Sequence, residues 1–172
     1  GSNRWKGPIP TTIGNADSLT VFNVESNALS GTLPLSLFDL PFKDLAIGDN
    51  EFTGTIPSNI SGASLLTSLS LGPNLFVGEI PTSLSELTNL VRLSMNGIPN
   101  LSGRLPATFG ISLTNMAELS ISGTSVNGDI PEQFSLMTNL EILRLNNNSL
   151  ARNIPSSLSL LTNLRKLCKY YT

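Results

Sequence analysis

The apolar and polar positions of this chain recur in the same order along most of its length. In residues 66–87, Leu69 and Leu71 alternate with Ser68 and Ser70. This period of two predicts a short strand with its leucines toward the core and its serines toward solvent. Two more leucines then follow three residues apart, a spacing that favours one helical turn. The unit opens at Leu19, Phe42, Leu66, Leu90, Met116, Leu140 and Leu164.

The spacing of these openings predicts a stacked array of repeats. Neighbouring openings are 23 to 26 residues apart, as from Leu19 to Phe42 and from Leu90 to Met116. No single unit can cover its own leucines, so neighbouring units are expected to bury one another's apolar faces. We therefore predict one domain over residues 1–172, with about seven repeats and a partial repeat at residues 3–18.

Asparagine, glycine and proline mark fixed positions inside the unit. An inward asparagine at the turn can donate to and accept from the backbones of adjacent turns, which predicts a structural ladder. Glycine two residues before an Ile-Pro or Leu-Pro pair permits positive φ, and the proline discourages further sheet pairing. The ladder positions are Asn27, Asn50, Asn74 and Asn148. Thr124 occupies the same position in a further unit.

The unit resembles the plant-specific class of leucine-rich repeat, whose pattern is LxxLxLxxNxLxGxIPxxLxxL, most clearly in residues 66–87. The resemblance implies an α/β solenoid: a right-handed superhelix with a concave parallel β-sheet, short second sheet segments, and short helical or 3-10 turns on the convex side. Members of this class include receptor-kinase ectodomains, receptor-like proteins and secreted inhibitors of cell-wall-degrading enzymes. The resemblance therefore implies recognition of a partner.

The ends of the chain depart from this pattern. The family's N-terminal cap with its cysteine pair is absent, and Lys169 occupies a position that is apolar in the other units. Solenoids need polar caps over their terminal cores. We therefore expect an excerpt of a longer protein that lacks both caps. Cys168 either pairs with a cysteine outside this chain or is a free thiol.

The outward strand positions predict where a ligand would bind. Small polar residues dominate them and no Trp, Tyr or Phe occurs there, although aromatics and Arg usually anchor interfaces. Strands ~4.8 Å apart would bring Arg92, Glu118 and Arg144 together. This cluster could hold a carboxylate or an acidic sugar, or Arg92 and Glu118 could neutralise each other. The first alternative predicts that Arg144, without an acidic neighbour of its own, contributes most to binding. The candidate contacts are Arg92, Glu118, Arg144, Ser94, Ser120, Asn96 and Asn146.

Composition narrows the functional classes. A formal net charge of −2 with scattered basic residues argues against nucleic acid as a partner. The absence of histidine removes the usual general base and the commonest metal ligand, so we predict neither an enzyme nor a cofactor or metal site. No apolar run reaches the ~18 residues needed to cross a bilayer, so no membrane segment is expected within this chain.

Two functions remain open from the sequence. The first is a non-catalytic recognition module of a secreted or cell-surface receptor-like protein, which would bind a protein or peptide, with carbohydrate as a further class. The second is a scaffold subunit of a multiprotein assembly, inside the cell. Sequons at Asn59, Asn100 and Asn147 are compatible with glycosylation and secretion, and attached sugar would separate the two functions.

Overall fold

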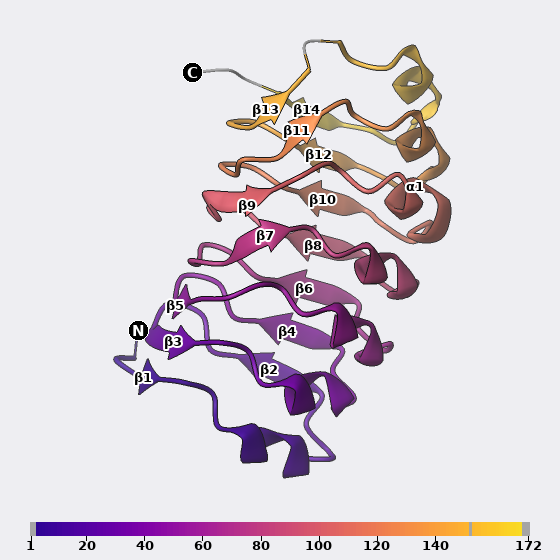
Figure 1. Cartoon of the computed structure of the whole chain (residues 1–172). Coiled ribbons are helices and arrows are strands. Elements are labelled where there is room, and N and C mark those ends of the chain that lie inside the picture. The colour runs from indigo at the N-terminus through magenta and orange to yellow at the C-terminus, as the bar shows by residue number, and fades with distance from the viewer. Residues whose placement is uncertain (1–2, 152, 170–172) are drawn as a thin grey trace.

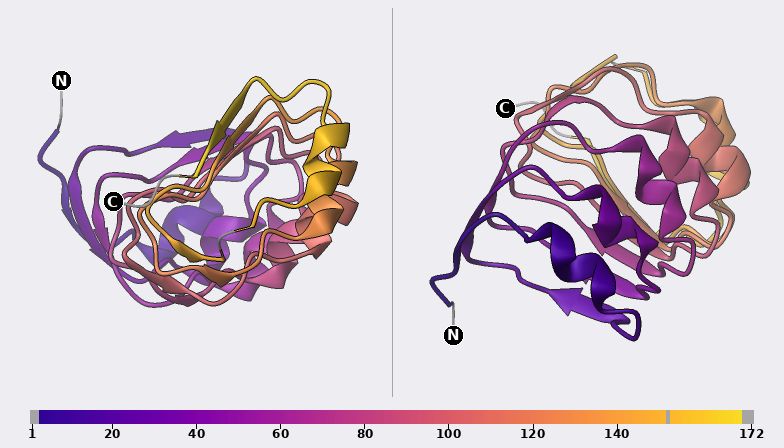
Figure 2. Two further views of the ribbon diagram at one scale, coloured as in Figure 1. Left: turned by 90° about the horizontal axis from the view of Figure 1, so that it is seen from above. Right: turned by 60° about the horizontal axis from the view of Figure 1, so that its bottom comes forward.

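The protein is a stack of similar turns that rises from its N-terminal to its C-terminal end (Figure 1). The computed structural model describes residues 3–151 and 153–169. Each complete turn contains a strand of a large sheet, a short strand of one of three smaller sheets and a short helix, in that order. The helices form one column along the stack, as the two further views also show (Figure 2). This arrangement confirms the predicted α/β solenoid.

The alternating leucines build the large sheet. Within the described residues it has seven parallel strands, in the order β14-β12-β10-β8-β6-β4-β2. Leu69 lies in register between Leu45 and Leu93, so the inward leucines form a continuous row. The outward face of this sheet is here called the concave face. Its strands are β2 (Val21–Asn23), β4 (Asp44–Ala46), β6 (Ser68–Ser70), β8 (Arg92–Ser94), β10 (Glu118–Ser120), β12 (Ile142–Arg144) and β14 (Lys166–Cys168).

The short strands form the second side of each turn, whose outward surface is here called the lateral face. In the part of the chain that the structure describes, they pair as β1-β3-β5, β7-β9 and β11-β13. Gly78 is the middle residue of β7, and its φ of 88° is a backbone conformation that only glycine adopts without strain. The strands are β1 (Lys6–Gly7), β3 (Ala28–Gly31), β5 (Glu51–Phe52), β7 (Val77–Glu79), β9 (Asn100–Ser102), β11 (Asn127–Gly128) and β13 (Ser149–Leu150).

A short helix closes each turn. The 3-10 helices follow an extended proline, such as Pro81 before η4. The unit that begins at Leu90 has one extra residue in this segment, and the segment forms the α-helical turn α1 in place of a 3-10 helix. In α1 the Leu113 N–H donates to the Phe109 carbonyl, four residues earlier. In η4 the corresponding bond, from Leu87 to Leu84, spans three residues. The helices are η1 (Thr11–Asn15), η2 (Leu35–Asp39), η3 (Ser58–Gly62), η4 (Thr82–Glu86), α1 (Thr108–Ser112), η5 (Glu132–Leu136) and η6 (Ser156–Leu160).

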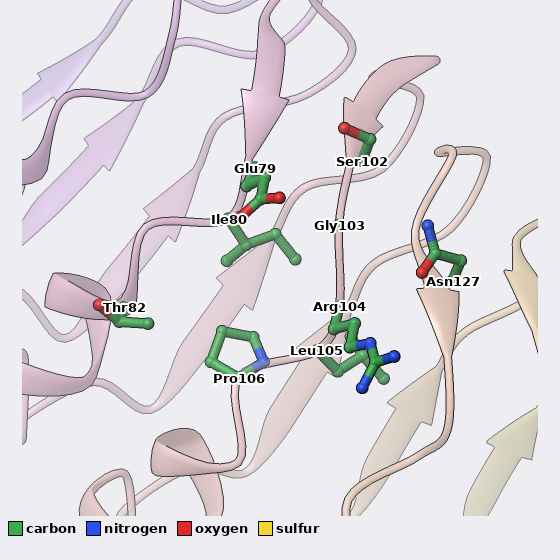
Figure 3. Close-up of a pocket in the computed structure, with 9 residues that line it drawn as sticks. All are labelled: Glu79, Ile80, Thr82, Ser102, Gly103, Arg104, Leu105, Pro106 and Asn127. Atoms are coloured by element: carbon green, nitrogen blue, oxygen red, sulfur yellow. The ribbon is translucent and has the colours of Figure 1, made fainter.

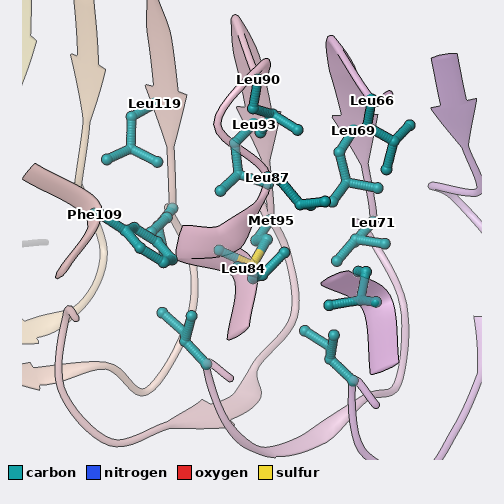
Figure 4. Packing of buried hydrophobic residues seen from close by; sticks show 14 of the residues in the cluster. Leu66, Leu69, Leu71, Leu84, Leu87, Leu90, Leu93, Met95, Phe109 and Leu119 are labelled. Carbon is teal, nitrogen blue, oxygen red and sulfur yellow. The ribbon is translucent and has the colours of Figure 1, made fainter. Parts of the chain in front are cut away.

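The apolar residues between these elements form one continuous core (Figure 4). Leu93 is 1% exposed and packs in the cluster that includes Met95 and Phe109. Phe22 and Leu167, on the first and last strands of the large sheet, are only partly buried. The stack therefore gains its stability where each turn has a neighbour on both sides. Among the described residues, no helix has the length and apolar character to span a membrane.

Candidate functional site on the concave face

Buried asparagines hold the turns that follow the concave strands. Asn74 is 2% exposed, and its Nδ2 donates to the carbonyls of Ile47 at 2.9 Å and Leu71 at 2.6 Å. Its Oδ1 accepts from the Phe52 N–H at 2.9 Å. Buried backbone groups are costly unless they are paired. This side chain therefore ties its own turn to the preceding one. Related bonds are made by Asn27, Asn50 and Asn148.

The ladder is interrupted in the two units that carry Arg92 and Glu118. Ile98, fully buried, occupies the ladder position of the unit that begins at Leu90. Thr124 occupies it in the next unit, where the Asn148 Oδ1 accepts from both the Thr124 N–H and the Thr124 hydroxyl. In these two units, the buried side chain of Ile98 and the hydroxyl of Thr124 therefore replace the asparagine amides that the other complete units have at this position.

Three charged side chains lie on adjacent strands of the concave face. Arg92 on β8 is in register with Glu118 on β10, and Ser120 on β10 is in register with Arg144 on β12. The Arg144 guanidinium donates to the Glu118 carboxylate and, at 3.1 Å, to the Ser120 hydroxyl. The Arg144 and Glu118 side chains are 29% and 31% exposed. Their ion pair is therefore open to solvent on one side.

This pairing corrects the expectation for Arg144. The sequence suggested that Arg144 has no acidic partner and that Glu118 neutralises Arg92, whereas Glu118 pairs with Arg144. The reason is that Arg144 also has the Ser120 hydroxyl within reach, which holds its guanidinium toward β10. Arg92 is exposed and, within residues 3–151 and 153–169, makes no ion pair. Arg92 is therefore the charge in this cluster that is open to a ligand.

The polar residues beside the cluster form a hydrogen-bonded track. Asn96 donates to the Ser94 hydroxyl at 3.1 Å and accepts from the Ser122 N–H at 2.9 Å. The Ser122 hydroxyl donates to Asn146 at 2.9 Å. These partly buried side chains still present donors and acceptors at the surface. Ser120, in contrast, is 1% exposed, so it positions Arg144 and is not itself a surface contact.

A second contact on this face was not singled out from the sequence. The Ser70 hydroxyl on β6 donates to the Glu25 carboxylate, which follows β2, at 2.7 Å. The turn that contains β4 lies between the turns of these two residues. Ala46 and Gly48 leave the intervening turn without a long side chain, so the carboxylate can pass over it. These two small residues were the signal in the sequence that a contact could skip one repeat.

The lateral face holds a shallow depression of about 580 Å³ (Figure 3). Ile80 and Leu105 lie at its base and are 5% and 4% exposed, while Glu79, Arg104 and Asn127 are exposed around it. Its full lining is Glu79, Ile80, Thr82, Ser102, Gly103, Arg104, Leu105, Pro106 and Asn127. The repeat pattern does not reveal it, because the pattern fixes only the inward positions.

The sequence and fold of this chain are similar to those of known repeat proteins. A family model described as Leucine Rich Repeat matches residues 139–161. The crystal structure of PEPR1-AtPEP1 is 33% identical, with a TM-score of 0.91, over 97% of this chain and 23% of that chain. The Arabidopsis receptor kinase HAESA, solved with the peptide hormone IDA and the co-receptor SERK1, is 32% identical, with a TM-score of 0.93, over 98% of this chain and 28% of its own.

A further similar structure is the ectodomain of the membrane receptor kinase GASSHO1/SCHENGEN3 from Arabidopsis thaliana, in complex with CASPARIAN STRIP INTEGRITY FACTOR 2. It is 34% identical, with a TM-score of 0.89, over 96% of this chain and 20% of that chain. The chain therefore spans less than a third of the length of each of these three proteins.

Proposed function

Because this chain belongs to the leucine-rich-repeat family, we propose that it is a ligand-recognition module of a secreted or cell-surface receptor-like protein. Its concave face binds an extended peptide or a peptide segment of a protein, and it catalyses no reaction. The similar structure of HAESA, solved with the peptide hormone IDA, supports this class of ligand.

The observation that carries the proposal is the charged row on β8, β10 and β12. Two arginines and one glutamate give it a net charge of +1, and its unpaired charge, Arg92, is exposed. Charge-assisted bonds to a carboxylate are stronger than bonds between neutral groups. Asn96 and Asn146 beside the row supply neutral donors and acceptors for a peptide backbone or polar side chains. The site therefore favours a peptide with an acidic side chain or a free carboxyl terminus.

The size of the face sets the length of the probe. From β2 to β14 there are six strand spacings of ~4.8 Å, or about 29 Å, which about nine extended residues would span. The test is a synthetic library of peptides of this length with free carboxyl termini, screened against the immobilised chain. We expect enrichment of acidic peptides, and at least about tenfold weaker binding of the selected peptides to the Arg92→Ala variant.

A matched control removes the same charge elsewhere. Arg104 is exposed on the lateral face, so Arg104→Ala should leave the binding of the selected peptides unchanged. Equal losses in the two variants would show that overall charge, and not the concave site, attracts the peptides. Failure to enrich any peptide, together with recovery of the native protein in a fixed complex with unglycosylated subunits, would overturn the proposal in favour of a scaffold.

A further inference from the structure

The three sequons lie in different structural settings. Asn59 is in η3, in the column of helices, and Asn100 opens β9 on the lateral face. Asn147 lies in the turn between β12 and β13 and has a φ of 56°. N-linked glycosylation joins the Nδ2 of asparagine to a bulky, solvated sugar, so the native structure must leave that atom and its surroundings open. The three sites differ in how open the asparagine Nδ2 is.

Asn59 does not leave its amide free. Its Nδ2 donates to the Leu35 carbonyl of the preceding helix, η2, at 3.0 Å. Its Oδ1 is buried and has no hydrogen-bond partner among the described residues. A sugar on Nδ2 would have to project through the contact between η2 and η3, or the side chain would have to leave it. A chain modified at Asn59 is therefore at a disadvantage in folding.

Asn100 has the opposite setting. It is exposed, and within the described part of the chain its side chain has no hydrogen-bond partner. The buried Leu101 beside it fixes the alternation of β9, so that Asn100 and Ser102 both point outward. The Ser102 hydroxyl donates to the Gly78 carbonyl at 3.2 Å, which ties the third residue of the sequon to β7.

Exposed apolar side chains lie next to Asn100. Val77 on β7 is in register with Asn100 and is 43% exposed, and Leu75 two residues earlier is 48% exposed. On its other side, Val77 is bridged to Thr55. Leu75 and Val77, here called the lateral apolar patch, thus lie one strand spacing from the sequon. Contiguous apolar surface that is left uncovered promotes association.

We propose that Asn100 carries an N-linked glycan whose first sugars cover the lateral apolar patch, and that Asn59 is unmodified in the folded protein. The inference rests on the proposed secretion of the chain. The Asn100 Nδ2 forms a bond to the anomeric carbon of a lipid-linked N-acetylglucosamine donor. The nitrogen loses one proton, and the lipid pyrophosphate leaves from that carbon. A glycan at this position also keeps protein partners off the lateral face near β7 and leaves the concave face open.

Site occupancy is the first test. The full chain is secreted from insect cells behind an added signal peptide, and glycopeptide mass spectrometry measures the sugar on each asparagine. We expect sugar on Asn100 in most secreted molecules and none on Asn59. A bare Asn100, or sugar on Asn59 in folded secreted protein, would overturn the inference.

The second test asks whether the glycan covers the patch. Asn100→Gln removes the acceptor, and Ser102→Ala removes the sequon while leaving the asparagine. Both variants should lose the mass of one glycan and bind an apolar fluorescent dye more strongly. Adding Leu75→Ser and Val77→Ser to either variant should return dye binding to that of the glycosylated protein. Dye binding that stays unchanged when the glycan is lost would refute the covering role.

The two proposals fail in different ways. A chain that carries sugar at Asn100 but enriches no peptide would contradict the peptide-binding function and leave this inference standing. A chain that binds acidic peptides through Arg92 while Asn100 stays bare would contradict only this inference.

Discussion

Glu118 and Arg144 form an ion pair between neighbouring strands without being opposite each other in the sheet. Glu118 is in register with Ile142, and Arg144 with Ser120, so the pair is diagonal. The diagonal geometry leaves Arg92, which is directly in register with Glu118, exposed on the other side. The acidic side chain therefore orients one arginine and leaves the second available.

The first prediction concerns the strength of this ion pair. Its partners are 29% and 31% exposed, so solvent screens their attraction. A double-mutant cycle with Glu118→Gln and Arg144→Gln should give a coupling free energy of only about 0.5 kcal/mol in urea denaturation. The coupling should shrink as salt is added, because salt screens exposed charges. A coupling of several kcal/mol that is insensitive to salt would mean that the pair is much less solvated than the structure shows.

The second prediction concerns ligand charge. Glu118→Gln keeps the shape of the side chain and raises the net charge of the row from +1 to +2, counting two arginines and no glutamate. Acidic peptides selected by the wild-type chain should then bind a few-fold more tightly, with a larger gain at low salt. Titration calorimetry at two salt concentrations measures the change in affinity and its dependence on salt. Glu79→Gln, the same change at an exposed lateral position, should have no effect, and equal gains from both variants would argue against a local site.

The fold could be predicted from the sequence because its determinants are periodic. Leu69 and Leu71 face inward by alternation alone, and the return of that pattern every 23 to 26 residues requires stacking, as between Leu19 and Phe42 or Leu90 and Met116. The positive φ of Gly78 follows from its fixed place before Ile80-Pro81. Each of these features is set by a residue and its near neighbours in the chain.

The site was predicted only in part, because its contacts depend on side-chain orientation. Strand order places Arg92, Glu118 and Arg144 together, but it does not decide which arginine the carboxylate contacts. That choice depends on Ser120, whose hydroxyl also reaches Arg144. The bond between Ser70 and Glu25 likewise requires a side chain to cross a whole repeat, which a pairwise comparison of adjacent strands does not consider.

The third prediction tests the stacked core. Leu93 is 1% exposed between Leu69 and Leu119 in the inward row of the large sheet. Leu93→Ala removes buried methyl groups and leaves a cavity, which should cost about 2–5 kcal/mol in the free energy of unfolding. Leu167→Ala, in the same row on the last strand, should cost clearly less because Leu167 is only partly buried. Urea denaturation of both variants measures the difference, and equal losses would contradict a core that depends on neighbours on both sides.

The fourth prediction concerns the asparagine ladder. Asn74→Ala leaves the Leu71 carbonyl and the Phe52 N–H without their side-chain partner in a buried position, whereas the Ile47 carbonyl keeps its bond from the Asn50 amide. An unpaired buried polar group costs about 1–3 kcal/mol, so with two such groups the variant should lose about 2 kcal/mol or more of unfolding free energy.

The control for this ladder prediction is Asn27→Ala. Asn27 is only half-buried, and it makes its bonds near the first strand of the sheet. Water can replace an amide there, so the loss should be below about 1.5 kcal/mol, the usual net value of one hydrogen bond. Hydrogen exchange should also become faster at the Phe52 amide in Asn74→Ala, because that N–H loses its acceptor. Unchanged protection at Phe52, together with equal destabilisation by the two variants, would show that asparagine acts here through turn conformation and not through bonds between repeats.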